Sequence, residues 1–155
     1  MEKSGKFRLT SLERNWILYD VGNSAFVLMV ATLIPIFFNA LAAAGGLSSV
    51  EYLAYWGYAS SAVTIITAVL SPILGTVADT KGFKKAIFIL CVFVGIVGCC
   101  AMGAASAWLP FLVIFVIAKV GFSGSLVFYD SMLSDVTTPE RMDEVSSRGY
   151  AWGYI

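Results

Sequence analysis

The chain has 155 residues, of which 59% are hydrophobic and only 13% are charged. Since a soluble domain usually carries about 25% charged residues, this composition excludes a water-soluble globular protein and indicates an integral membrane protein in contact with the lipid bilayer. The net charge is zero, and we expect no nucleic-acid partner.

Residue types that commonly carry out catalysis are scarce. The chain contains no His, which excludes the zinc-protease helix motif and His-dependent triads or proton relays from this segment. Its three cysteines, Cys91, Cys99 and Cys100, all lie in one apolar run, and we interpret them as packing residues rather than as a disulfide or metal site. With no nucleophile–base pair in the sequence, we expect no enzyme activity, no metal and no cofactor.

Four apolar runs are long enough to cross a bilayer, which takes about 20 residues. The expected spans cover residues 16–44, 51–78, 84–105 and 108–133. A fifth span starts near Val145 and is truncated by the end of the sequence. Pro35 lies inside the first run and predicts a kinked helix. In the third, Gly95, Cys99 and Gly103 recur every four residues and predict a face for close helix packing. The sequence therefore predicts an all-α membrane protein.

Basic residues alternate between the two ends of these spans. They occupy the N-terminal segment, the loop between the second and third spans, and the region after the fourth span, whereas the other two turns contain none. These residues are Lys3, Lys6, Arg8, Arg14, Lys81, Lys84, Lys85, Arg141 and Arg148. Because cytoplasmic loops are enriched in Lys and Arg, we expect a cytoplasmic N-terminus in a bacterial plasma (inner) membrane.

The loop between the second and third spans carries a motif. Its residues at fixed spacing are Gly75, Asp79, Gly82, Lys84 and Lys85. The first Gly permits close helix approach and the second a tight reversal, while the Asp can cap a helix N-terminus or meet basic side chains. The spacing resembles the signature loop of the major facilitator superfamily, although Thr80 and Phe83 replace two basic residues of that pattern.

Two other stretches resemble the vacuole-effluxer-like branch of this superfamily. One is Trp16-Ile-Leu-Tyr-Asp-Val-Gly-Asn-Ser-Ala-Phe26, and the other runs from Gly121-Phe-Ser-Gly through Pro139-Glu-Arg141 to Gly149-Tyr-Ala-Trp-Gly153. The resemblance implies twelve helices in two six-helix halves around a central cavity, with this chain as part of the N-terminal half. It also implies secondary transport of a small solute, in fungal members the efflux of amino acids. Asp79, Asp135 and Arg141 would form a cytoplasmic charge cluster that steadies one conformation.

A polar cluster lies near the start of the first span. Asn23 and Ser24 follow Asp20 by three and four residues, so the three share one helix face. One interpretation is a cavity-facing site for substrate or a coupling proton. The other is a structural acid near the headgroups, paired with Arg14 or a neighbour.

Lys119 lies near the middle of the fourth span, about 16 Å from Trp108 at the helical rise of 1.5 Å per residue. Ser123 and Asp130 return to nearly the same face. Snorkelling is the alternative for a long Lys side chain, but we favour a cavity or ion-pair role at this depth. Asp20 is the expected carboxylate partner, because the resemblance places the first and fourth helices beside one cavity.

Two other functions fit part of the pattern. The chain could be a four-span membrane scaffold or assembly protein, or a small dimeric four-span exporter in which Asp20 serves as the acid of the first span. The unfinished fifth span favours the secondary transporter, whose partners are a small-molecule substrate, a coupling proton and the remaining transporter helices.

Overall fold

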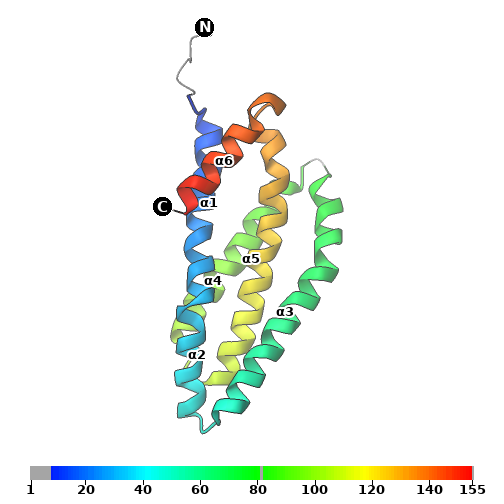
Figure 1. The fold of residues 1–155 in the computed structure, drawn as a ribbon. Coiled ribbons are helices and arrows are strands. Elements are labelled where there is room, and N and C mark those ends of the chain that lie inside the picture. Colours follow the sequence, from blue (N-terminus) through cyan, green and yellow to red (C-terminus); the bar gives the residue numbers. More distant parts are fainter. Residues whose placement is uncertain (1–7, 81, 155) are drawn as a thin grey trace. The chain divides into compact units, whose positions relative to one another are not determined.

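The computed structural model describes residues 8–80 and 82–154 and consists of helices joined by short turns (Figure 1). In chain order they are α1 (Ser11–Ala31), α2 (Leu33–Ala44), α3 (Ser49–Ala78), α4 (Lys84–Ala104), α5 (Trp108–Val136), the 3-10 helix η1 (Pro139–Arg141) and α6 (Met142–Gly153). The predicted all-α fold is confirmed. Lys3, Lys6 and Lys81 lie outside the described residues.

The four predicted spans correspond to helical segments that are long and apolar enough to cross a membrane. The first of these segments, Ser11–Ala44, comprises α1 and α2 and begins five residues before the predicted boundary. The last, α5, continues to Val136, three residues beyond the prediction. The short helix α6 begins at Met142, close to the predicted start of a fifth span.

The first span is interrupted where α1 gives way to α2. Thr32 has φ −124° and ψ −67°, outside the helical region. Pro35 follows three residues later; its ring excludes a regular helix there, and it has no N–H to donate to the carbonyl of Ala31. The predicted kink is confirmed, and it takes the form of a break between two helices.

Two turns depend on glycines in the left-handed region, where residues with a Cβ are strained. Gly46 has φ +85° between α2 and α3, and Gly82 has φ +96° between α3 and α4. The predicted reversal at Gly82 is therefore confirmed. At the start of α3, Ser48 and Glu51 form a capping box, in which each side chain bonds the other residue's backbone N–H.

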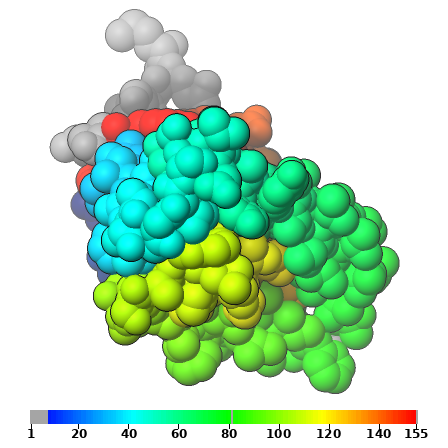
Figure 2. All heavy atoms as spheres, turned by 90° about the horizontal axis from the view of Figure 1, so that it is seen from below, coloured from blue at the N-terminus to red at the C-terminus, as the bar shows by residue number. Residues whose placement is uncertain are grey.

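The chain divides into two compact units, formed by the described parts of residues 1–29 and 132–155 (unit 1) and by residues 30–131 (unit 2). Unit 2 contains α2, α3, α4 and most of α5 as consecutive antiparallel helices. The α2–α3 and α4–α5 turns lie at one end of this unit, which Figure 2 shows face-on, and the α3–α4 loop lies at the other (Figures 1 and 2).

Aromatic side chains from three helices form the core of unit 2. Phe38 and Phe111 are fully buried, with ring centres 6.1 Å apart. Trp56 of α3 lies 5.6 Å from Phe38 and 4.7 Å from Phe115, again between ring centres. This cluster fixes α2, α3 and α5 around one another and places Trp56 and Phe115 at the wall of a pocket described below.

Helices α4 and α5 approach closely, and the predicted stripe takes part in this contact at Gly95, where an added Cβ would lie 3.8 Å from the backbone N of Phe122. A Cβ added at Gly98 would lie 2.5 Å from the Cβ of Ala118, whereas one at Gly103 would meet nothing within 4 Å among the described residues. A Cβ at Gly121 would lie 3.1 Å from the carbonyl oxygen of Cys91. The stripe prediction is wrong at Gly103, because the contacting face of α4 passes through Gly98 instead.

Candidate functional site

A partly open pocket of about 380 Å³ lies in unit 2. Its lining includes Pro35 of α2, the polar and aromatic residues Trp56, Ser60 and Thr64 of α3, and Phe115 and Lys119 of α5. The α3 residues are spaced by four, as are the two from α5, so each set lies on one helix face. The break before Pro35 also lies at the pocket wall, because Val30 and Ala31, the last residues of α1, line the same pocket.

Lys119 brings a positive charge to this pocket. Its side chain is half-buried, and its Nζ lies 4.6 Å from the ring centre of Phe122, a cation–π distance. The rings of Trp56 and Phe115 stack at 4.7 Å with an interplanar angle of 29°. The pocket therefore combines a cationic group with an aromatic wall.

The residues of α3 that line the pocket were identified only from the structure. Trp56, Ser60 and Thr64 are not among the residues predicted from the sequence, although their spacing places them on one helix face. Of the predicted companions of Lys119, Ser123 is half-buried and Asp130 is exposed, and neither lines this pocket.

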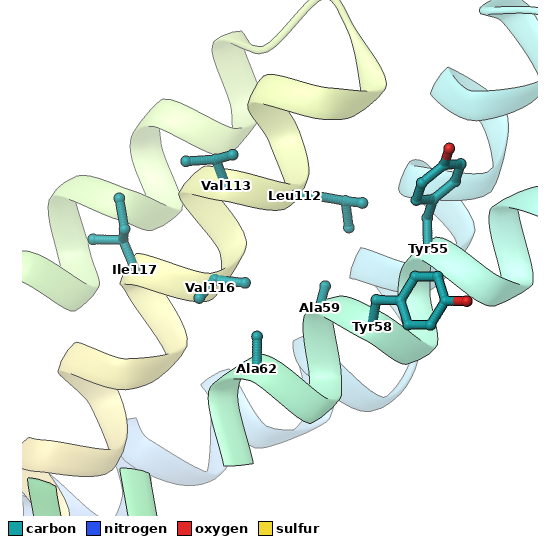
Figure 3. Close-up of a pocket in the computed structure, with 8 residues that line it drawn as sticks. All are labelled: Tyr55, Tyr58, Ala59, Ala62, Leu112, Val113, Val116 and Ile117. Atoms are coloured by element: carbon teal, nitrogen blue, oxygen red, sulfur yellow. The ribbon is translucent and has the colours of Figure 1, made fainter. Parts of the chain in front are cut away.

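A second hollow of about 360 Å³ lies between α3 and α5 and is apolar (Figure 3). Leu112 and Val116 extend from α5 toward the small residues Ala59 and Ala62 of α3, and two tyrosines border it. None of its described lining residues is charged. Because such a surface cannot orient a polar solute, the Lys119 pocket is the better candidate site.

The predicted polar cluster of α1 lies in unit 1, where it faces α6. A Cβ added at Gly153 would lie 3.5 Å from Oδ2 of Asp20 and 2.8 Å from Oγ of Ser24. The Ser24 hydroxyl donates to the Asp20 carbonyl oxygen at 3.1 Å, and Asn23 is buried. Asp20 also lies beside Gly149, so the α1 acid meets a Gly-x-x-x-Gly face of α6, the spacing that permits close helix approach.

The most extensive polar cluster of unit 1 centres on Glu13, whose side chain is only 1% exposed. Arg141 donates to it through two nitrogens, Nε to Oε1 at 2.9 Å and Nη2 to Oε2 at 2.8 Å. The Thr137 hydroxyl donates to Oε1 at 2.6 Å. These contacts join the start of α1 to the segment that follows α5, and the hydrogen bonds to Glu13 raise the pKa of Arg141.

Glu13 is a residue that the sequence prediction missed. Its partners include Thr10: the Thr10 N–H donates to Oε2 at 2.8 Å and the Glu13 N–H donates to the Thr10 hydroxyl at 3.2 Å. This is the capping box typical of Thr-x-x-Glu at a helix start, a signal that is readable in the sequence. The predicted role of Arg141 involved Asp79 and Asp135, whereas the structure pairs it with Glu13.

The α3–α4 loop motif is only partly held by contacts within unit 2. Lys84 donates from Nζ to the carbonyl oxygen of Ser131 at 3.2 Å, which links the loop to α5. Asp79 is the C-terminal cap residue of α3, and the N-cap position of α4 is Phe83, with no side-chain cap, so Asp79 does not cap that helix. Lys85 and Asp79 are exposed, as is Asp135 in α5.

Among the described residues, Gly75 makes no close helix contact, so its packing role in the motif stays a prediction. A Cβ at this position would meet nothing within 4 Å among the described residues.

Within the part of the chain that the structure describes, no three His, Cys, Asp or Glu side chains lie close enough together to hold a metal ion.

Comparison with known proteins agrees with these features. The family described as vacuole effluxer Atg22 like matches residues 47–149. The chain is 42% identical over 151 residues to the "Uncharacterized MFS-type transporter YxiO" of Bacillus subtilis (strain 168), an alignment that covers 96% of the chain and 35% of that relative. The chain thus spans about a third of the length of this relative. No solved structure matches the chain.

Proposed function

Because the chain belongs to the vacuole effluxer Atg22-like family, we propose that it forms the N-terminal part of a secondary transporter of the major facilitator type. Transporters of this kind place their substrate site between repeats and expose it alternately to the two sides of the membrane. The cargo is a small organic solute, and amino acids are the first class to test. The protein resides in the bacterial plasma membrane with its N-terminus in the cytoplasm.

The observation that carries this proposal is the pocket beside Lys119. A charged side chain within a membrane span is unfavourable and usually faces a cavity, water or a partner. Lys119 lines a pocket together with the hydroxyl-bearing residues Ser60 and Thr64. We therefore assign the solute-binding role in this segment to Lys119. Ser123 and Asp130 lie farther along the same helix and outside this pocket, so their role in the cavity stays a prediction.

The α3–α4 loop and the charges near α6 act as conformational elements in this proposal. Gly82 and Lys84 hold the loop against α5, as the positive φ and the contact with Ser131 support. Gly75, Asp79, Lys85 and Asp135 complete the loop motif, and Arg141 fixes the start of α1 through Glu13. In this proposal, the loop residues and the Glu13–Arg141 pair together stabilise one conformation of the transport cycle.

The proposal is tested with the full-length protein in sealed proteoliposomes, by measuring uptake of radiolabelled solutes, amino acids included, under an imposed proton gradient. Lys119→Ala is expected to reduce uptake strongly. Arg148→Ala is the matched control, since Arg148 pairs with Glu144 at an exposed position of α6. Failure of the wild type to move any solute, or full activity of Lys119→Ala, contradicts the proposed role.

Asp20 remains the predicted carboxylate partner of Lys119 in the solute-free protein, and a solute that carries its own carboxylate would take its place on binding. If the two form a pair, each single change to Ala leaves a charge unpaired, at a penalty below the about 3–5 kcal/mol of a fully buried pair, because both side chains are only partly buried. The double variant Lys119→Ala, Asp20→Ala should then lose less uptake than the two single losses combined. Simple additivity of the effects on uptake would show that the pair does not exist.

A further inference from the structure

The polar groups in the Lys119 pocket are mostly hydrogen-bond donors. Lys119 contributes an ammonium and Ser60 a hydroxyl that can donate. The Thr64 hydroxyl is already used, because it donates to the Ser60 carbonyl oxygen at 3.0 Å. None of the described lining residues is acidic. This lining is suited to a negative group of a solute and offers no carboxylate to a positive one.

The rest of the wall is apolar and flat. The stacked rings of Trp56 and Phe115 form one side, and Pro35 lies at the break in the first span. A volume of about 380 Å³ lies at the small end of the range for small-molecule sites. A planar apolar body can stack on the half-buried Trp56 ring, behind which Phe115 is only 3% exposed, whereas a large or strongly hydrated solute gains little from this wall.

We infer that this pocket binds a small organic monoanion with a flat apolar body. This inference rests on the proposed transport function and narrows its solute. The carboxylate lies toward Lys119 and Ser60, and the apolar body lies against the Trp56 ring. A zwitterion with the same body binds less well, because its ammonium is desolvated without a counter-charge from this lining and is repelled by Lys119.

The test uses three probes that share a phenyl ring and a two-carbon chain: 3-phenylpropionate, phenylalanine and 2-phenylethylamine. Their binding to the purified full-length protein is measured by calorimetry. We expect the anion to bind about tenfold or more tightly than phenylalanine, since leaving the ammonium of phenylalanine desolvated without a partner corresponds to at least that ratio, and the amine not to bind. Phenylalanine binding as tightly as the anion, or no saturable binding of the anion, would overturn the inference.

Paired variants locate the effect in the pocket. Lys119→Met removes the charge at similar length and should weaken 3-phenylpropionate binding about tenfold or more, whereas Lys119→Arg should retain most of it. Ser60→Ala should weaken binding, while Ser61→Ala, at the exposed neighbouring position on α3, should not. Equal effects of the two serine variants, or unchanged binding by Lys119→Met, would place the anion elsewhere and overturn the assignment.

The two proposals fail in different ways. If the protein moves some solute across liposomes but does not bind the anion through Lys119, the transporter stands and the anion site is wrong. If 3-phenylpropionate binds as expected and no solute is moved, the binding site stands and the transport function is wrong.

Discussion

Glu13 illustrates how one side chain can connect distant parts of a membrane protein. It is almost fully buried, yet its carboxylate accepts hydrogen bonds from the Thr10 backbone, the Thr137 hydroxyl and the Arg141 guanidinium. Arg141 also donates to the carbonyl oxygen of Arg8 at 2.9 Å. Because a guanidinium matches a carboxylate with two parallel bonds, this pairing fixes orientation as well as distance.

Removing either member of this pair should destabilise the protein. Glu13→Ala is expected to cost somewhat less than the about 3–5 kcal/mol of a fully buried pair, because the Arg141 side chain retains 34% exposure. Arg141→Lys should recover only part of the stability, since an ammonium cannot form both bonds in the same geometry. The measurement is denaturant unfolding of the detergent-solubilised full-length protein.

Two further variants control this experiment. Arg148→Ala removes a cation from an exposed i,i+4 pair at 2.8 Å and should change stability by no more than about 0.5 kcal/mol. Glu13→Ala combined with Arg141→Ala should lose less than the sum of the two single changes. A Glu13→Ala protein as stable as the wild type would show that the pair contributes no net stability.

At the scale of the helices, the contact between α4 and α5 depends on glycines, and the closest approach is at Gly98. Ala118 is fully buried against Gly98, and its Cβ already occupies the place that a side chain at Gly98 would need. Helix association in membranes relies on such close packing, because lipid is as apolar as the helix surfaces. The spacing of α4 and α5 is therefore set here by the absence of a Cβ.

Gly98→Ala is expected to destabilise the full-length protein by about 1–3 kcal/mol through overpacking. Gly103→Ala, on the same helix and with nothing within 4 Å of its Cβ position among the described residues, should be neutral or stabilising by up to about 1 kcal/mol through helix propensity. Thermal unfolding in detergent compares the two. Equal effects of the two substitutions would contradict the packing seen between α4 and α5.

The elements were predictable because length and composition determine them, whereas their contacting faces were not. A helix that is apolar on all sides shows no amphipathic pattern, so the sequence could not decide between Gly103 and Gly98 as the contact on α4. Pro35 marked the break because its effect is local. The pairing of Glu13 with Arg141 spans 128 residues, and no periodicity reports such a contact; the local capping box alone was readable.

The candidate site shows the same limit. Lys119 was identifiable because a charge within an apolar run stands out. Ser60 and Thr64 were not, since hydroxyl side chains in membrane helices often bond their own backbone, as Thr64 does with the Ser60 carbonyl. Only the packing around Trp56 and Phe115 reveals that these positions share a pocket with Lys119.

At the scale of the whole molecule, the arrangement of unit 2 carries a prediction about the membrane. The α2–α3 and α4–α5 turns lie at one end of this unit and the α3–α4 loop at the other (Figures 1 and 2). Three aromatic residues lie near the end with the α2–α3 and α4–α5 turns: Tyr55, Tyr58 and Trp108. The ring centres of Tyr55 and Trp108 are 4.8 Å apart. Such aromatic residues are typical of a membrane–water interface.

Single cysteines at the turns test this topology in whole cells, in a full-length background in which Cys91, Cys99 and Cys100 are replaced by Ala. Ser49→Cys and Ser106→Cys, at exposed positions beside the two turns, should both react with a membrane-impermeant maleimide added outside. Thr80→Cys, in the exposed lysine-bearing loop, should react only after permeabilisation, because positive loops remain in the cytoplasm. Labelling of Thr80→Cys in intact cells would invert the proposed orientation, and different accessibility of Ser49→Cys and Ser106→Cys would contradict the arrangement of unit 2 itself.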